Sequence, residues 1–480
     1  MCRGVGGDLA TSLPTPTDGG RSYTFQLRSG IRYSNGRPVR PEDFRRAIER
    51  TLKLGWSAYY PNMVGGAACL AVPARCDLSR GIVTDDRANT VTFHLVTPDP
   101  EFLQRLALWP AFAVPAGTPD HDIGSHPLPA TGPCEVASVT PRQVTLVRNP
   151  YFHEWSHAAQ PDGYPNRIVW RIGASTQAAV TAVEQGAADY TIDPPPADRL
   201  NEVQARFASQ LHVSPDDVTI EMGLNTQVAP FTDVRVRRAL NYAIDRAKLT
   251  RLLGQDSRPT CQELAPYIPG YQRYCPYTLN PNRAGTWSAP DLAKAQALIA
   301  ASGTRGTPIT IWSAPGYLTD FTSAGRYLIS LLDRLGYPTH VRSFSGSNAT
   351  SNWFVLVSNP RTRAQAYLSV LAPNYPAASE FLGPEYNSCQ SSLPATQSNV
   401  PALRFCNEQF HATVRSALAA ESARSPTAAA LWAKADRQFT DQAPVVPLVT
   451  PSTTDFVSHR VGDYEYNAQL SVLIDQLWVH

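Results

Sequence analysis

The spacing of apolar residues divides the chain into short strands and amphipathic helices. Residues 23–28 alternate apolar and polar side chains, which predicts a half-buried strand. The segment 39–55 places its apolar residues on one helical face, with Pro41 in the first turn and Gly55 at the end, and so predicts a helix. Further strands are predicted at 91–96, 144–149 and 167–172, and a helix at 175–186.

Residues 233–254 carry the clearest helical pattern of the chain. The apolar residues recur with a period near 3.6, Thr232 or Asp233 can cap the first turn, and Gly254 ends the pattern. We expect one continuous helix. Its charged residues are expected on the helix surface in salt bridges, namely Arg235, Arg237, Arg238, Asp245 and Arg246.

Beyond residue 285, helices and strands alternate. Helices are predicted at 290–303 and 323–336, with strands at 307–313, 338–344 and 366–372. This order is typical of a βαβ unit, in which parallel strands are joined by a helical crossover. A last helix at 425–441 and a strand and turn within 445–459 complete an α/β pattern.

Composition is that of a folded protein without a strong charge bias. Of 480 residues, 43% are hydrophobic and 17% charged, which is enough apolar material for large cores. The net charge is +2 and the charges are interspersed, so no nucleic-acid partner is predicted. No run approaches the ~20 apolar residues that span a bilayer, and the first ten residues lack the apolar core of a secretory signal.

Six of the eight cysteines form three local pairs in loop-like sequence. The pairs are Cys69 with Cys76, Cys261 with Cys275, and Cys389 with Cys406. Such pairs are typical of loop-closing disulfides, which indicate an oxidising compartment. Unpaired thiols are the alternative reading; a zinc site is disfavoured because there is no CxxC and no matching histidine pair.

The chain carries no motif that predicts catalysis. GxSxG, HExxH, the P-loop and GxGxxG are all absent from the sequence. His153 and His157 have helical spacing but follow a turn, so we predict no metal there, and no cofactor elsewhere. A hydrolase on an unrelated α/β frame is therefore the weakest reading, and we expect a protein that is not an enzyme.

Six segments, in order, carry a resemblance. They are SYTFQLRSGIRYSNGRPVRPEDFRRAIER, LPATGPCEVASVTPRQVTLVRNPYF, AVTAVEQGAADYTID, IEMGLNTQVAPFTDVRVRRALNYAIDR, LWAKADRQFTDQAPVVPL and DYEYNAQLSVLIDQLWV. Together they resemble the family 5 extracellular solute-binding proteins, which serve dipeptide and oligopeptide ABC importers, here of actinobacterial type. The match runs from about Ser22 to the C-terminus.

The resemblance implies an α/β fold of the two-lobed periplasmic-binding-protein type (type II), with an extra subdomain. Residues 22–130 would form that subdomain, 131–224 with 450–480 lobe I, and 225–449 lobe II. The implied function is to capture a peptide or related oligomeric solute in an interlobar cleft by hinge closure. A monomer that docks on ABC permease membrane subunits outside the cytoplasm is expected.

The resemblance also predicts an incomplete start, because family members carry a signal and further lobe I strands before the segment matched by residues 23–28. The alternative function follows from this: a ligand-sensing module at the C-terminal end of a larger regulatory fusion protein.

Ligand contacts are implied by one loop in particular. LSVLAPNYPAASEFLGPEYN resembles the family loop "W..DYPDP..F", whose Asp meets a free peptide amino terminus. Asn374 stands at the Asp position, so a ligand with a free amino terminus is in doubt, and Glu380 is the substitute carboxylate. We predict Asn374, Tyr375 and Glu380 as ligand-binding residues.

Two further ligand contacts are predicted outside this loop. Asn225 lies at the lobe crossover, and Trp353 precedes a strand. For Asn374 and Tyr375 the alternative is turn formation. For Asn225 it is a cap or bridge at the hinge, and for Trp353 it is core packing.

Overall fold

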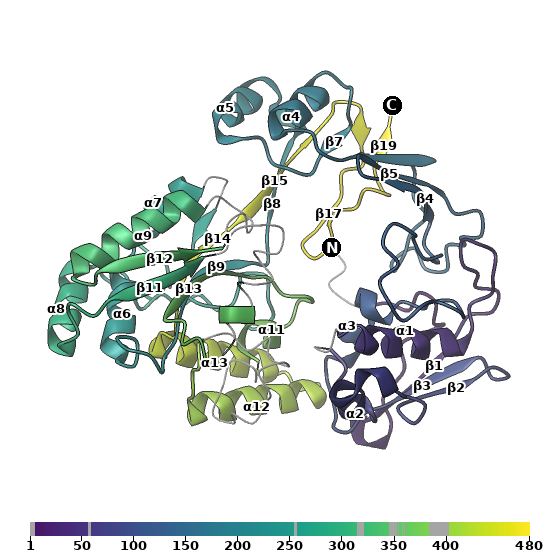
Figure 1. Ribbon diagram of the computed structural model, residues 1–480, viewed down its shortest axis with the longest axis horizontal. Helices are drawn as coiled ribbons and strands as arrows, with labels where there is room; N and C mark the ends of the chain where they lie inside the picture. The colour runs from purple at the N-terminus through teal and green to yellow at the C-terminus, as the bar shows by residue number, and fades with distance from the viewer. Residues whose placement is uncertain are drawn as a thin grey trace. The chain divides into compact units, whose positions relative to one another are not determined.

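The computed structural model describes residues 5–55, 59–253, 257–313, 321–344, 353, 355–357, 359, 361–383 and 403–480. By internal contacts they fall into two units, unit 1 (Met1–His212 with Asp455–His480) and unit 2 (Val213–Thr454). The chain passes between the units twice, within β8 (Leu211–Pro215) and β15 (Ser452–Val457). These strands are neighbours in a three-stranded sheet with β7 (Tyr190–Thr191) (Figure 1).

The N-terminal part of unit 1 is a three-stranded antiparallel sheet that shares a core with helix α1. The strand order is β1–β3–β2. The elements are β1 (Ser22–Gln26), β2 (Ile82–Asp85), β3 (Thr90–His94), α1 (Pro41–Lys53), α2 (Gly66–Ala71), α3 (Phe102–Leu106), and the short 3-10 turns η1 (Asp18–Gly20), η2 (Pro73–Arg75) and η3 (Trp109–Ala111). Tyr23, Phe93 and Phe102 pack ring against ring in this core, with centroids 4.8 and 5.5 Å apart.

Helix α1 begins where its sequence predicts. Pro41 occupies the first turn, and the backbone N–H of Arg40 donates to Asp43 Oδ2 at 3.0 Å. The hydroxyl of Tyr33 donates to the same oxygen at 3.0 Å. Ile48 and Leu52 on the apolar face are fully buried, so the predicted face is the one that packs.

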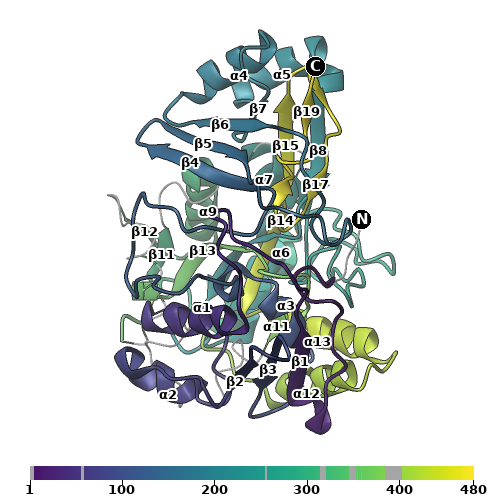
Figure 2. The ribbon, with the colours of Figure 1, turned by 90° about the vertical axis from the view of Figure 1, so that its right-hand side faces the viewer.

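The rest of unit 1 contains a second antiparallel sheet and a small helical layer (Figure 2). The sheet consists of β4 (Cys134–Thr140), β5 (Gln143–Arg148) and β6 (Arg167–Arg171). The other elements are α4 (Thr176–Glu184), α5 (Ala197–Arg206), η4 (Ala208–Gln210), and two pairs of short strands, β16 (Val461–Gly462) with β19 (Trp478–Val479) and β17 (Tyr466–Asn467) with β18 (Ser471–Val472). Val180, Val183 and Val203 from the helices pack on Phe456 of β15.

Unit 2 is built on a six-stranded mixed sheet of order β10–β14–β9–β13–β11–β12. Its strands are β9 (Thr219–Leu224), β10 (Arg258–Pro259), β11 (Ile309–Ser313), β12 (Thr339–Ser343), β13 (Ala366–Leu371) and β14 (Val445–Thr450). Its helices are α6 (Val234–Ala243), α7 (Arg246–Leu253), α8 (Leu292–Ser302), α9 (Phe321–Leu335), α11 (Ser379–Leu382), α12 (Glu408–Ser422) and α13 (Ala428–Gln442). Strand β11 is parallel to β12 and to β13, so the predicted βαβ unit through α9 is confirmed.

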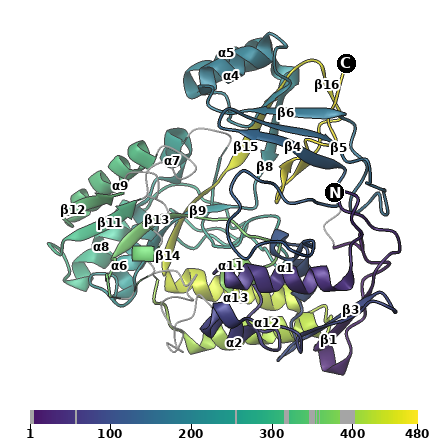
Figure 3. The same ribbon diagram turned by 45° about the vertical axis from the view of Figure 1, so that its right-hand side comes forward.

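Alternate residues of the sheet in unit 2 serve two separate cores. Ile220, Met222 and Leu224 of β9 belong to the core shared with α6, α7, α8 and α9. Tyr367 of β13 and Val445 of β14 belong to the core shared with α11, α12 and α13. Figure 3 shows α12 and α13 lying side by side, well separated from α8 and α9. Because successive side chains of a strand point to opposite faces of the sheet, both faces of this sheet are covered by helices.

The prediction of one helix over 233–254 is wrong, because two helices occupy this segment. Asp233 caps α6 as predicted, accepting a hydrogen bond from the backbone of Arg235. Ile244 then turns into an extended conformation. The N–H of Asp245 donates to the Tyr327 hydroxyl of α9 at 2.8 Å, and Asp245 Oδ1 accepts from the N–H of Lys248 at 2.9 Å. A tertiary contact therefore replaces one helical hydrogen bond, and Asp245 starts α7.

The expected surface position of the arginines is also wrong for two of them. Arg237 is 6% exposed and Arg246 is fully buried, and both donate to backbone carbonyls instead of carboxylates. Arg235 does form the predicted ion pair, with Asp233 at 2.7 Å. The boundaries of the extra subdomain and the two lobes stay predictions.

No helix in the described part of the chain combines the length and the apolarity that a membrane crossing needs.

Candidate functional site

The loop that follows β13 brings three of the predicted site residues together. Asn374 is exposed, and both its backbone N–H and its side-chain amide donate to Glu380 Oε2, each at 2.8 Å. Glu380 lies in the first turn of the short helix α11 and is half-buried. The turn at the end of β13, which contains Asn374, Tyr375 and Glu380 and is called the corner below, thus presents polar groups and one carboxylate.

Tyr375 anchors this corner. Its side chain is only 5% exposed, and its carbonyl accepts a hydrogen bond from the N–H of Ala377 at 2.7 Å. Pro373 and Pro376 flank the pair, which restricts the backbone of the turn. The geometry supports turn formation for Tyr375, and its role in ligand binding stays a prediction.

Asn225 lies at the opposite end of the same pair of strands. Strand β9 runs antiparallel to β13, with Leu224 opposite Ala366 and Thr219 opposite Leu371. Asn225 follows Leu224, whereas Asn374 follows Leu371. The six paired residues alone span about 17 Å. The structure therefore does not bring Asn225 together with Asn374.

The hydrogen bonds of Asn225 hold the chain before β13. Its Nδ2 donates to the carbonyl of Ala364 at 2.9 Å, and its Oδ1 accepts from the N–H of Gln227 at 3.1 Å. The side chain is 5% exposed. This is the bridging role given above as the alternative, and ligand contact by Asn225 stays a prediction.

Trp353 lies in the core shared with α12 and α13. It is 5% exposed, its indole N–H donates to the carbonyl of Trp312 at 3.2 Å, and its ring meets that of Tyr367 edge-on at 6.2 Å. Core packing accounts for this position. A ligand role for Trp353 also stays a prediction.

Two of the three predicted disulfides are formed in the structure. Cys69 pairs with Cys76, and Cys261 pairs with Cys275. Cys406 is disulfide-bonded as well, and Cys389, its expected partner, lies outside the described residues. The spacing of the cysteines therefore predicted these two disulfides correctly.

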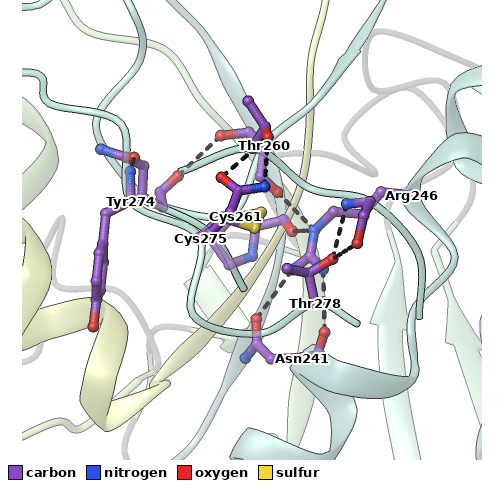
Figure 4. The surroundings of a disulfide bond; sticks show 12 residues. Asn241, Arg246, Thr260, Cys261, Tyr274, Cys275 and Thr278 are labelled. Carbon is purple, nitrogen blue, oxygen red and sulfur yellow. Dashed lines mark hydrogen bonds between the residues drawn. A yellow bond between two sulfur atoms is a disulfide. The ribbon is translucent and has the colours of Figure 1, made fainter. Parts of the chain in front are cut away.

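The Cys261–Cys275 disulfide closes a loop that rests on a buried guanidinium (Figure 4). Arg246 Nε donates to the carbonyls of Thr260 at 2.7 Å and Pro447 at 2.9 Å, and its two terminal nitrogens donate to Asn241 at 3.1 and 3.2 Å. Burial lowers the pKa of Arg246 to about 9. Carbonyl dipoles rather than a counter-ion stabilise this charge.

Sequence reasoning missed the carboxyl groups buried beside the same loop. Glu221 of β9, Glu263 of the loop and Asp436 of α13 are at most 3% exposed. Burial raises the pKa of Glu221 and of Asp436 to about 7. The available signal was Glu221 itself, a lone acid within the apolar strand sequence TIEMGL.

No metal-binding cluster is found among the described residues. They contain no group of three or more His, Cys, Asp or Glu side chains that could hold a metal ion. His157 of the HEWSH segment contacts Glu154 at 3.3 Å on an exposed surface.

Comparison with known proteins assigns the chain to a family. Residues 4–392 match the family described as "Bacterial extracellular solute-binding proteins, family 5 Middle". The chain belongs to this family. Its members are solute-binding proteins, which agrees with the predicted family.

Curated relatives of the family are distant. The chain is 27% identical over 270 residues to the "Probable deoxycholate-binding periplasmic protein YgiS" of Escherichia coli K12, with 53% of this chain covered. It is 26% identical over 315 residues to the glutathione-binding protein GsiB of Escherichia coli K12, with 64% of this chain covered. The chain spans about half the length of these relatives, 48% and 55%.

Solved structures extend the likeness to the whole fold. The "Clavulanic acid biosynthesis oligopeptide binding protein 2" superposes with a TM-score of 0.80 at 23% identity, covering 99% of this chain and 86% of that one. The murein tripeptide binding protein MppA of Escherichia coli gives 0.74 at 19%, covering 98% and 89%. DppA of Helicobacter pylori, in complex with the peptide STSA, gives 0.73 at 18%, covering 99% and 90%. The family 5 member is thus a mixed α/β protein of the type II periplasmic-binding-protein fold, as predicted.

Proposed function

We propose that this family member is the solute-binding component of a bacterial ABC importer and captures a peptide or related oligomeric solute. Capture would proceed by hinge closure, and the strands that pass from one unit to the other, β8 and β15, are the candidate hinge. The observation that carries the proposal is the family match over most of the chain, together with two α/β units linked by β8 and β15. Relatives named for glutathione and peptides support the ligand class.

We further propose that the protein works outside the cytoplasm as a monomer that delivers its solute to ABC permease membrane subunits. The disulfides Cys69–Cys76 and Cys261–Cys275 support an oxidising compartment. Light scattering on the purified protein checks the monomer. Solute uptake by membrane vesicles containing a permease tests delivery, and binding without uptake would favour the sensing-module alternative.

The corner at Asn374 sets the chemistry of the ligand in this proposal. An amide at this position cannot neutralise an ammonium group, and the nearest carboxylate, Glu380, is already engaged by two hydrogen bonds from Asn374. A ligand with a blocked or uncharged end is therefore preferred over one with a free amino terminus.

Native mass spectrometry of the purified protein tests the proposal directly, because a captured solute survives as an added mass. Calorimetric titration then compares short peptides with free and acetylated amino termini, together with glutathione. Binding of at least one peptide or amide oligomer, with the acetylated form at least as tight as the free form, is expected. No added mass and no binding across the panel would contradict peptide capture.

Asn374→Asp tests the role of the corner. A carboxylate here should increase the affinity for free amino termini by about tenfold, or about 1.4 kcal/mol. Asn282→Asp adds the same charge at an exposed position of unit 2 and serves as the control. Equal affinities in the two variants would remove Asn374 from the site.

A further inference from the structure

The disulfide-closed loop 261–275 is fastened to the rest of unit 2 through carboxyl groups. Asp436 Oδ1 accepts hydrogen bonds from the N–H groups of Glu263 at 3.2 Å and Leu264 at 3.4 Å. Its Oδ2 accepts from Gln262 Nε2 at 2.6 Å. Asp436 therefore has donors for both oxygens, although it is 1% exposed.

Glu221 and Glu263 differ from Asp436 because they face each other. The two carboxyl groups are within hydrogen-bonding contact and are 3% and 0% exposed. No N–H or O–H of the described residues donates to Glu221 Oε2 or to either carboxyl oxygen of Glu263. Contact between these two groups is favourable only when one of them carries a proton that the other accepts.

The surroundings offer no counter-charge for this pair. From β13, the Tyr367 hydroxyl lies close to both carboxyls and has no hydrogen-bond partner among the described residues. From α13, Asp436 adds negative charge beside Glu263. Arg437 attracts Asp436, and within the described part of the chain no cationic side chain is ion-paired with either glutamate. Two buried carboxylates in contact would repel each other strongly.

Burial is the main cause that raises the pKa of both glutamates, and for Glu263 the charge of Glu221 adds to it. Since the pKa is raised in the folded protein, the protonated pair stabilises the fold at low pH. The contribution is lost as the pH rises through the folded pKa values of the pair. The pKa of Glu221 is about 7, and that of Glu263, which holds the shared proton and donates it to Glu221, is raised well above its usual 4.5.

We propose that Glu221 and Glu263 form a proton-binding latch, in which one shared proton fastens the loop 261–275 to strand β9 and loss of that proton releases the loop. The latch acts near the corner at Asn374. Thr219 Oγ1 donates to the carbonyl of Glu263 at 3.0 Å, and Thr219 is paired with Leu371, three residues before Asn374. The inference stands on the packing of unit 2 and does not depend on the proposed function.

Hydrogen exchange of the full chain, followed by mass spectrometry from about pH 5.5 to 8.5 with labelling times scaled for intrinsic exchange, tests the latch. Protection of peptides from 261–275 should fall more than tenfold across this range. In Glu263→Gln the amide can donate to the Glu221 carboxylate and accept from the protonated carboxyl, so titration of Glu221 no longer breaks the contact and most of this fall should disappear. Glu408→Gln, an exposed change on α12 in the same unit, should behave as the unmodified chain does.

Three results would overturn the latch. The first is protection of 261–275 that does not change with pH, and the second is an unchanged pH dependence in Glu263→Gln. The third is protection restored at high pH by sodium or calcium ions but not by tetramethylammonium. This third result would mean that the pair holds a cation. Infrared spectroscopy of the unmodified chain decides the matter if the variant does not fold. Absorption of protonated carboxyl groups should be present near pH 6 and decrease by pH 8.5, and its absence at pH 6 would exclude a shared proton.

Discussion

Asn374 directs two N–H groups, one from its backbone and one from its side chain, at a single oxygen of Glu380, each over 2.8 Å. Such a double contact fixes the carboxylate relative to the turn that Tyr375 anchors. In the proposed binding function Asn374 is thus a positioning residue for Glu380 as much as a ligand contact. The corner carries a negative charge even though Asn374 itself is neutral.

Glu380→Gln separates the charge of this corner from its shape. The glutamine oxygen can accept both hydrogen bonds from Asn374, so the free energy of unfolding should change by less than about 0.5 kcal/mol. Since a ligand with an uncharged end is expected, affinities for neutral solutes should change less than about twofold in calorimetric titration. A loss of about tenfold that is confined to cationic solutes would show instead that Glu380 meets a positive group of the ligand.

The two disulfides should differ in their contribution to stability. Cys261–Cys275 closes a loop with a separation of 14 residues, and Cys69–Cys76 one of 7. In the chain-entropy model they contribute about 3 and about 2.5 kcal/mol. Cys261→Ser with Cys275→Ser should therefore lower the free energy of unfolding of unit 2 by about 3 kcal/mol, measured by denaturant titration. A loss below 1 kcal/mol would show that the loop is held by its hydrogen bonds instead.

Arg246→Met should be strongly destabilising because it leaves buried carbonyls of Thr260 and Pro447 without a donor. A loss of about 3 kcal/mol or more in the free energy of unfolding is expected. Arg251→Met, on the exposed side of the same helix α7, is the matched control and should cost less than about 0.5 kcal/mol. Similar losses in the two variants would mean that helix propensity, not the buried guanidinium, is responsible.

His212 should make unit 1 less stable in mild acid. Its ring stacks on Tyr464 with centroids 3.8 Å apart, and burial lowers its pKa below the usual 6.5, an effect opposed by Asp455. Because the folded form binds the proton more weakly than the unfolded chain does, stability is complete above pH 6.5 and declines as the pH falls through that value to the folded pKa.

Thermal unfolding of His212→Phe between about pH 5 and 7.5 checks this expectation. The phenyl ring keeps the stack and removes the titrating group, so the fall in melting temperature on acidification should be smaller than in the unmodified chain. His459→Phe, at an exposed position of the same unit, should leave that fall unchanged. An identical acid response in all three proteins would exclude His212 as its source.

Much of the local structure could be predicted because it depends on neighbours in the sequence. Asp233 and Asp291 cap their helices, Gly303 ends α8 in a left-handed conformation, and the alternation after residue 285 gives the βαβ unit. The cysteine pairs that are seven and fourteen residues apart also form disulfides, as expected. Together with the six matching segments, these signals were sufficient for the fold class and the family.

Of the candidate site, the sequence by itself determined only the cluster of Asn374, Tyr375 and Glu380, whose members are within one short turn. Tertiary structure alone decided that Asn225 lies at the other end of the β9–β13 pair, that Tyr327 interrupts the helix at Asp245, and that Glu221 meets Glu263. The physical reason is the same in each case. Periodicity reports whether a residue is buried, whereas strand direction and packing between distant segments decide which group it is buried against.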